Sequence, residues 1–278
     1  MMHSSLLVFG GPYSNLAATR AMLAVVQELG IPASSVICTG DVVAYGAEAE
    51  QTCELIQQSG IRVVMGNCEE SLANESADCG CGFEPGMLCS LLAEDWYSYA
   101  RRQISASTRE WMSQLPRQIE FEFAGLKFRV IHGGVDQINR FMFYSSPQRD
   151  FQQQLQLADC DVVIGGHCGL PFGRQLEQGC WLNAGVIGLP ANDASRNGWY
   201  MLLRQIENGV EVSWHRLDYD AEHSFNSMQA AGLSAYADTL LTGLWPAMDI
   251  LPAQERARQG CKIILPPLQI QVARKGSK

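Results

Sequence analysis

The sequence has no apolar run that approaches the roughly 18 residues needed for a membrane-spanning helix. It also does not begin with a charged segment followed by a long apolar stretch, which is the pattern of a secretory leader. The first absence predicts that the chain does not sit in a membrane. Both together predict a cytoplasmic location by default.

Positive charge is scarce as well, because the chain has 20 Lys and Arg residues against 29 Asp and Glu, a formal net charge of -9. Nucleic-acid backbones and anionic membrane surfaces are bound by clusters of Lys and Arg. We therefore expect neither of them as a partner. An anionic substrate would need a local source of positive charge, such as a metal ion.

The paired C-x2-C elements of zinc knuckles and ferredoxins are missing, although the chain has 10 cysteines. These cysteines are too dispersed for the framework of a small disulfide-rich domain, so we expect a reducing compartment with free or metal-bound thiols; an individual disulfide stays open. Cys79, Cys81 and Cys89 fall within about residues 74–90, a Cys-rich stretch without periodicity that predicts an inserted loop.

The first half of the sequence alternates strand-like and helix-like segments, which predicts a largely parallel sheet. The expected order is a strand at 5–9, a helix at 16–29, a strand at 35–39, a helix at 47–59 and a strand at 61–65. A hairpin follows, with strands at 118–123 and 126–131 on either side of Ala124-Gly125.

The second half predicts a helix near 147–157, a strand at 161–164 and then consecutive strands over 172–217, which we expect to form a second, antiparallel sheet. Residues 219–241 have a helical pattern. We therefore expect one domain over residues 1–218 and a helical extension with a tail over 219–278. The basic end of the tail, Arg274-Lys275, is expected to fray.

Four polar side chains follow strand-like runs, each next to a glycine: Asp41, Asn67, His132 and His167. Loops at the carboxyl edge of parallel strands are where α/β folds gather their sites. A carboxylate, an amide oxygen and two imidazoles suit Mn²⁺, Fe²⁺ or Zn²⁺ better than Mg²⁺ or Ca²⁺, which prefer all-oxygen shells. The alternative is that each residue merely caps a helix or turns a loop.

The order Gly-Asp, Gly-Asn, His-Gly, Gly-His resembles the calcineurin-like metallophosphoesterase superfamily over roughly residues 4–217. The resemblance implies a four-layer α/β/β/α sandwich, an α/β fold, in which two metal ions hydrolyse a phosphoester. By the same resemblance, the ligands of the first ion are lost, because Gly11, Tyr13 and Gly169 stand in their places. The shell of the second ion, made by Asp41, Asn67, His132 and His167, is complete, so we expect one ion, with two as the alternative.

The family's proton donor, a His directly after the Gly-Asn, is replaced here by Cys68, which Glu69 follows. Either is a candidate donor. Losing a tuned general acid typically lowers the rate by about 10²–10⁴. After His132, Asn139 and Arg140 are candidate contacts to a substrate phosphate.

Thiolates offer an alternative, because Cys68 and Cys168 lie beside two of the inferred ligands and could rebuild a second site for a softer metal together with Asp41. The thiols of the insertion could join Cys68 in a metal or redox centre. The main hypothesis is a metal-dependent phosphoesterase acting on a small-molecule or protein phosphoester. Its rivals are a non-catalytic scaffold or sensor with one metal or with redox control, and a metal-thiolate enzyme. A homo-oligomer is compatible with all three.

Overall fold

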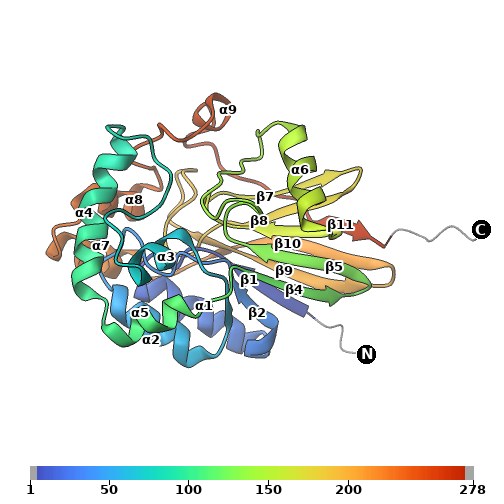
Figure 1. The fold of residues 1–278 in the computed structure, drawn as a ribbon, viewed down its shortest axis with the longest axis horizontal. Coiled ribbons are helices and arrows are strands. Elements are labelled where there is room, and N and C mark those ends of the chain that lie inside the picture. The colour runs from blue at the N-terminus through green and yellow to red at the C-terminus, as the bar shows by residue number, and fades with distance from the viewer. Residues whose placement is uncertain (1–4, 273–278) are drawn as a thin grey trace, which may run out of the picture.

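Two mixed β-sheets lie face to face between layers of helices in a computed structural model that describes residues 5–272 (Figure 1). The first sheet has the strand order β11-β10-β9-β1-β2-β3 and the second the order β4-β5-β6-β8-β7. The strands of the first sheet are β1 (Ser5–Phe9), β2 (Val36–Cys38), β3 (Arg62–Val63), β9 (Gly198–Ile206), β10 (Gly209–Leu217) and β11 (Leu268–Gln271). Those of the second are β4 (Gln118–Phe123), β5 (Leu126–Ile131), β6 (Val162–Gly165), β7 (Pro171–Leu176) and β8 (Gly179–Ala184).

The central strand β1 is apolar on both faces because both are covered. Leu6 and Val8 face the core between the two sheets, whereas Leu7 and Phe9 face the helices. Such a strand appears in sequence as a continuous apolar run rather than an alternation. The expected four-layer α/β/β/α sandwich is confirmed.

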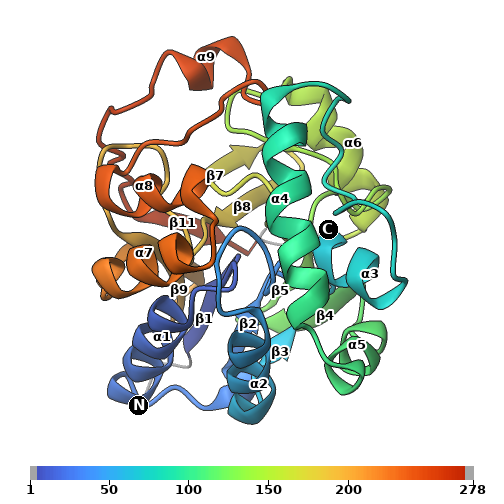
Figure 2. The same cartoon turned by 90° about the vertical axis from the view of Figure 1, so that its left-hand side faces the viewer.

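Helices cover the outer faces of both sheets, and Figure 2 looks onto the larger helical layer. That layer contains α1 (Leu16–Glu28), α2 (Ala49–Ser59), α4 (Leu88–Gln103), α7 (Ala221–Ala230) and α8 (Ser234–Thr242), with α3 (Asn67–Ala73) and α5 (Ala106–Ser113) beside it. On the second sheet, α6 (Gln148–Ala158) packs Phe151 against Trp181. The short helices η1 (Ala33–Ser35) and α9 (Ala253–Arg256) lie in connections.

One expectation about the sheets is wrong. Residues 172–217 do not form a separate antiparallel sheet: β7 and β8 complete the second sheet, where β8 pairs in parallel with β6, and β9 and β10 extend the first sheet beside β1. Strand-like alternation predicts that a segment is a strand but not which strand it pairs with. The helical pattern of 219–241 is likewise divided, because Gly232 with φ 77° ends α7 before α8 begins.

The tail contributes to the sandwich, since β11 pairs antiparallel with β10 and Ile270 is buried between the sheets. The boundary at residue 218 stays a prediction, and Arg274-Lys275 lies outside the described residues. Within residues 5–272, no helix has both the length and the hydrophobicity needed to cross a bilayer.

Candidate metal centre

The four candidate ligands lie where strands of both sheets end. Asp41 follows β2 and Asn67 opens α3 after β3, whereas His132 follows β5 and His167 follows β6. Asp41 and His167 have positive φ angles of 53° and 60°, a conformation that side-chain-bearing residues adopt mainly at functional sites and turns. The two sheets thus each bring two ligands to a common edge.

Two loops of the site approach each other so closely that one of the glycines beside the ligands, Gly40, is required there. Gly40 has φ 95°, and a Cβ atom there would lie 2.7 Å from the backbone nitrogen of Gly66. Only glycine allows this contact, which brings the loop before Asp41 against the loop before Asn67. The Gly40-Asp41 and Gly66-Asn67 pairs of the sequence therefore pack directly against each other.

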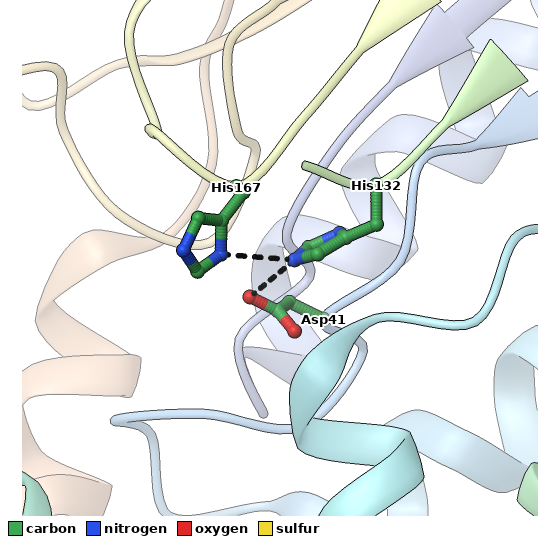
Figure 3. Close-up of side chains that lie close together, drawn as sticks. All are labelled: Asp41, His132 and His167. Carbon is green, nitrogen blue, oxygen red and sulfur yellow. Dashed lines mark hydrogen bonds and ion pairs between the residues drawn. The ribbon is translucent and has the colours of Figure 1, made fainter. Parts of the chain in front are cut away.

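Three of the four ligand atoms converge on the fourth, the Nε2 atom of His132. It lies 3.0 Å from Asn67 Oδ1, 3.1 Å from His167 Nδ1 and 3.2 Å from Asp41 Oδ2. Figure 3 shows Asp41, His132 and His167 pointing toward one another. All four side chains are buried, and the carboxylate and the two imidazoles form a group whose ligand atoms lie within 4.8 Å of one another.

This arrangement has too few protons for its acceptors. The Nδ1 atom of His132 lies 2.7 Å from the carbonyl oxygen of Thr39, which only accepts, so Nδ1 carries the proton. In the neutral ring, Nε2 is then an acceptor that faces a carboxylate oxygen, an amide oxygen and a second ring nitrogen. A single proton on Nε2 serves these neighbours only in part, whereas a cation among them would satisfy all four.

The spacing fits a metal ion as well. Ligand atoms about 2.1 Å from an ion and about 90° apart are separated by roughly 3.0 Å, close to the observed separations around His132 Nε2. The hydrogen bond from His132 Nδ1 to the carbonyl oxygen of Thr39 also fixes the orientation of the imidazole ring. Histidines that bind metals usually make such a second hydrogen bond through the ring nitrogen that does not face the ion.

The electrostatics of the two histidines differ. Burial disfavours a charged His132, but the charge of Asp41 and the hydrogen bonds to Asp41 and Thr39 together outweigh burial and raise the pKa of His132. Burial, followed by the charge of His132, lowers the pKa of His167 to about 3. His167 is thus kept neutral, as a metal ligand must be, and its Nε2 atom makes no hydrogen bond.

Glu69 and Cys68 lie next to the centre and contact the loops that carry its ligands. The carboxylate of Glu69 accepts hydrogen bonds from the backbone N–H groups of Asp41, Gly66 and Val43, at 2.8, 3.0 and 3.2 Å. Burial, and then the charge of Asp41, raises the pKa of Glu69 to about 7, and burial raises that of the Cys68 thiol. Neither side chain lines the cavity described next, so their role as proton donors stays a prediction.

A cavity of about 40 Å³ adjoins the centre on the side of Asp41 and His167. Its walls contain no Lys or Arg and include six large aromatic side chains, those of Tyr13, Tyr45, Phe83, Phe141, Tyr236 and Trp245. Tyr236 and Trp245 belong to the C-terminal extension. The sequence did not predict that this segment would line the cavity beside the site. No local pattern in the extension points to the site.

The Tyr13 ring lies beside Gly11 and Gly169, two positions that the family resemblance assigns to ligands of the first ion. A Cβ atom on Gly11 would meet its ring at 2.7 Å, and one on Gly169 would lie 3.8 Å from its hydroxyl oxygen. The phenol ring therefore occupies the space next to both lost ligand positions. Tyr13 thus forms part of the aromatic wall of the cavity, at a position where the resemblance expects a metal ligand.

The remaining candidate residues are held by other partners. Asn139 donates to the carbonyl of Gly80 at 2.9 Å, and Arg140 forms an ion pair with Asp136 at 2.6 Å. Cys168 lines the cavity and accepts a hydrogen bond from Asn183 at 3.2 Å. Their proposed roles in binding substrate or metal stay predictions.

The insertion does fold over the site. Cys79 and Cys81 form a disulfide, which corrects the expectation of free thiols for these two residues. Asn67 Nδ2 donates to the carbonyl of Cys79 at 2.9 Å, so the insertion holds a metal ligand directly. A spacing of two residues carries little signal for a disulfide, and the pairing depends on how the loop folds.

The fold and the converging Asp, Asn and two His residues agree with the family resemblance of the sequence, and so does comparison with known proteins. The chain matches the family model described as the calcineurin-like phosphoesterase superfamily domain over residues 3–209, and it belongs to that superfamily. It is also 27% identical over 246 residues to the uncharacterized protein MJ0912 of Methanocaldococcus jannaschii, covering 82% of this chain and 93% of that protein.

Two solved structures share the fold. A metallophosphoesterase from Sphaerobacter thermophilus is 18% identical with a TM-score of 0.66, covering 86% of this chain and 99% of that one. The hypothetical protein PH1004 from Pyrococcus horikoshii OT3 is 14% identical with a TM-score of 0.70, covering 87% and 99%.

Proposed function

We propose that this protein is a metal-dependent phosphoesterase that works with one divalent transition-metal ion. Asp41, Asn67, His132 and His167 would hold the ion. The observation that carries the proposal is the convergence of four buried acceptor atoms with too few protons between them. Mn²⁺, Fe²⁺ and Zn²⁺ suit this mixed oxygen and nitrogen set.

A bound ion of this kind lowers the pKa of a water molecule and polarises a phosphoryl oxygen. The chain itself supplies orientation and exclusion of solvent. Thr39 orients the His132 ring, Glu69 fixes the Asp41 loop, and the aromatic walls keep bulk water from the centre. Because no Lys or Arg lines the cavity, the ion would be the main positive charge for a phosphate group.

Substrate access would require movement of the C-terminal extension. A cavity of about 40 Å³ holds only a few water molecules, at about 10–15 Å³ each. A phosphoester would therefore have to displace part of the wall, and the partly buried Trp245 is one side chain that would have to move. The substrate class is a small-molecule or protein phosphoester whose reactive group reaches the ion from this side.

The test is hydrolysis of an aryl phosphate monoester and diester by protein loaded with Mn²⁺, Fe²⁺ or Zn²⁺. We expect turnover that falls by at least about 100-fold in Asp41→Asn and His167→Ala, in which a ligand is lost. His215→Ala, which changes a histidine of β10 away from the site, is the matched control and should keep full activity. Stoichiometric metal with no turnover on any ester would overturn the proposal.

A second candidate is a non-catalytic metal-binding protein of the same fold. The observation that favours it is the Tyr13 ring, which lies beside Gly11 and Gly169, two positions that the family resemblance assigns to ligands of the first ion. Such a protein would lose thermal stability on chelation, by an amount set by its metal affinity, without hydrolysing any ester. Turnover that depends on Asp41 would exclude it.

A further inference from the structure

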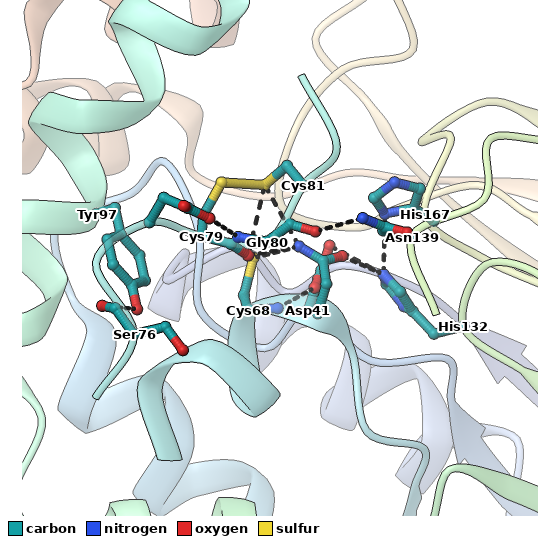
Figure 4. Close-up of a disulfide and its surroundings, with 12 residues drawn as sticks. Asp41, Cys68, Ser76, Cys79, Gly80, Cys81, Tyr97, His132, Asn139 and His167 are labelled. Atoms are coloured by element: carbon teal, nitrogen blue, oxygen red, sulfur yellow. Dashed lines mark hydrogen bonds and ion pairs between the residues drawn. A yellow bond between two sulfur atoms is a disulfide. The ribbon is translucent and has the colours of Figure 1, made fainter. Parts of the chain in front are cut away.

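Three sulfur atoms gather on the side of Asn67 that faces away from His132. The Asn67 Oδ1 atom faces the metal centre, whereas its Nδ2 atom lies 3.3 Å from Cys81 Sγ and 3.5 Å from Cys68 Sγ. Cys79 is joined to Cys81 by the disulfide. Figure 4 shows the Cys68 thiol pointing toward that disulfide, with Asp41 and His132 beyond it.

We propose that Cys68, Cys79 and Cys81 form a second metal site, which takes a thiophilic divalent cation such as Zn²⁺ or Cd²⁺ once the disulfide is reduced. This site would lie next to the centre made by Asp41, Asn67, His132 and His167 and would share Asp41 with it. A dithiol reductant would open it: the reductant becomes a disulfide, and its two electrons and two protons pass to the sulfurs of Cys79 and Cys81. The cation then displaces the thiol protons to solvent.

The geometry suits thiolate ligation. Sulfurs bound at about 2.3 Å to a tetrahedral ion lie roughly 3.8 Å apart, so they must share a small volume. The Cα atoms of Cys79 and Cys81 are 5.3 Å apart, and one amide group already contacts both Cys81 and Cys68. Small movements of the loop would therefore bring the three sulfurs around one ion.

A fourth donor is next to the sulfurs. The backbone N–H of Cys68 donates to Asp41 Oδ1 at 3.3 Å, while Asp41 Oδ2 faces His132. The second carboxylate oxygen thus lies beside Cys68, from which position it would complete a shell of three sulfurs and one oxygen. Soft sulfur donors favour Zn²⁺ or Cd²⁺ over Mn²⁺, which separates the preference of this site from that of the first.

The surroundings allow both protection and access. The three cysteine side chains are buried, with 1 to 5% of their surface exposed, so the bound ion would be shielded from water. Asp78 and Gly82 in the same loop are exposed, which gives a reductant and a metal a short path to the disulfide. Cys89 is not part of the site, because its thiol is held by Asp249 at 2.8 Å.

The experiment uses the full chain, reduced with an excess dithiol, freed of reductant under anaerobic conditions and titrated with Cd²⁺. We expect a sulfur-to-cadmium charge-transfer band in the ultraviolet that saturates at one equivalent. Cys68→Ser, Cys79→Ser and Cys81→Ser should each weaken Cd²⁺ binding by at least about 100-fold. Cys261→Ser, which removes an exposed thiol, should leave the band unchanged.

Two further samples make the result decisive. Protein with the disulfide intact should lack the band, and His132→Ala should keep it while losing the first centre and the proposed hydrolysis. The Cys79→Ser/Cys81→Ser double variant, checked by circular dichroism, shows whether the chain folds without the disulfide. The proposal is wrong if folded, reduced protein gives no band, or if the band survives in the double variant or in the oxidised protein.

Discussion

Glu69 is the residue on which the shape of the metal centre depends most directly. It does not face the ion position, yet its two oxygens hold the backbone of three residues in the loops that carry Asp41 and Asn67. A buried carboxylate is costly unless such donors satisfy it. The residue after Cys68 is thus an anchor for two loops at once.

Glu69→Gln should therefore destabilise the protein. The amide keeps one acceptor oxygen and places two N–H donors where backbone N–H groups already point, which should cost about 1–3 kcal/mol of unfolding free energy. Denaturant unfolding measures the change. Glu70→Gln is the matched control, since Glu70 forms only a surface pair with Arg117 and should change stability by no more than about 1 kcal/mol. Equal effects of the two substitutions would contradict the anchoring role.

Asp193 should make stability depend on acid pH. Its carboxylate is buried, but hydrogen bonds led by Arg216, at 2.6 Å, outweigh burial and lower its pKa. Because the folded-state pKa is depressed, the stabilisation is present above the ordinary aspartate pKa and is lost as the pH falls through the folded value. We expect the unfolding free energy of the wild type to fall more steeply on acidification than that of Asp193→Asn.

The control for this pH dependence is Asp238→Asn, which changes an exposed aspartate on α8. It should follow the wild-type curve. If Asp193→Asn also follows that curve from neutral to acid pH, then the contact with Arg216 does not contribute to acid sensitivity.

At the scale of secondary-structure elements, β11 joins the tail to the sandwich. The strand is short, but its register on β10 places Ile270 opposite Val210 and buries it between the sheets. Gln269 and Gln271 on either side are exposed, as the two-residue period of a strand requires. A segment expected to lie outside the main domain thus supplies part of its core.

Ile270→Ala should cost about 2–5 kcal/mol of unfolding free energy, because it removes buried methyl groups and leaves a cavity between the sheets. Gln269→Ala, at the adjacent exposed position, should cost little. Chemical denaturation followed by tryptophan fluorescence and by circular dichroism measures both. A small effect of Ile270→Ala, or a separate early transition, would mean that the tail folds independently, as the boundary at residue 218 predicts.

At the scale of the whole molecule, segments from the first and last quarters of the chain meet beside the metal centre. Tyr13 follows the first strand, and its ring contacts Tyr45 with 4.9 Å between centroids, which in turn contacts Tyr236 at 4.5 Å. Trp245 is held over Gly169 by hydrogen bonds to the carbonyl of Pro190 and the side chain of Asn192. Access to the centre is therefore controlled by a segment far from it in sequence.

Trp245→Ala should open this wall. We expect removal of bound metal by an external chelator to become at least several-fold faster, because the side chain covers the cavity next to Asp41 and His167. Stopped-flow or discontinuous metal analysis would follow the loss. Leu244→Ala, at the exposed neighbouring residue, should leave the rate unchanged. Unaltered metal release in Trp245→Ala would show that the ion leaves by another route.

Local sequence patterns predicted every strand except β11, most of the helices, and the set of Asp41, Asn67, His132 and His167. These features depend on local patterns, since an apolar run that ends in a glycine and a polar residue predicts both a strand and a side chain at its edge. The order of those segments predicted an α/β fold with a largely parallel sheet, whereas the four-layer sandwich was expected from the family resemblance.

Three features became visible once the chain was folded: the pairing of strands far apart in sequence, the Cys79–Cys81 disulfide, and the place of Tyr236 and Trp245 in the cavity wall. The pairing of β8 with β6 and of β9 with β1 depends on which arrangement buries both faces of the sheets, and no neighbouring residue encodes that choice. The same holds for Glu69. Its position after Cys68 suggested a proton donor, whereas its hydrogen bonds in the structure hold the loops before and after Asp41 and before Asn67. Local spacing determines elements and ligand types, whereas contacts between distant segments depend on packing of the whole chain.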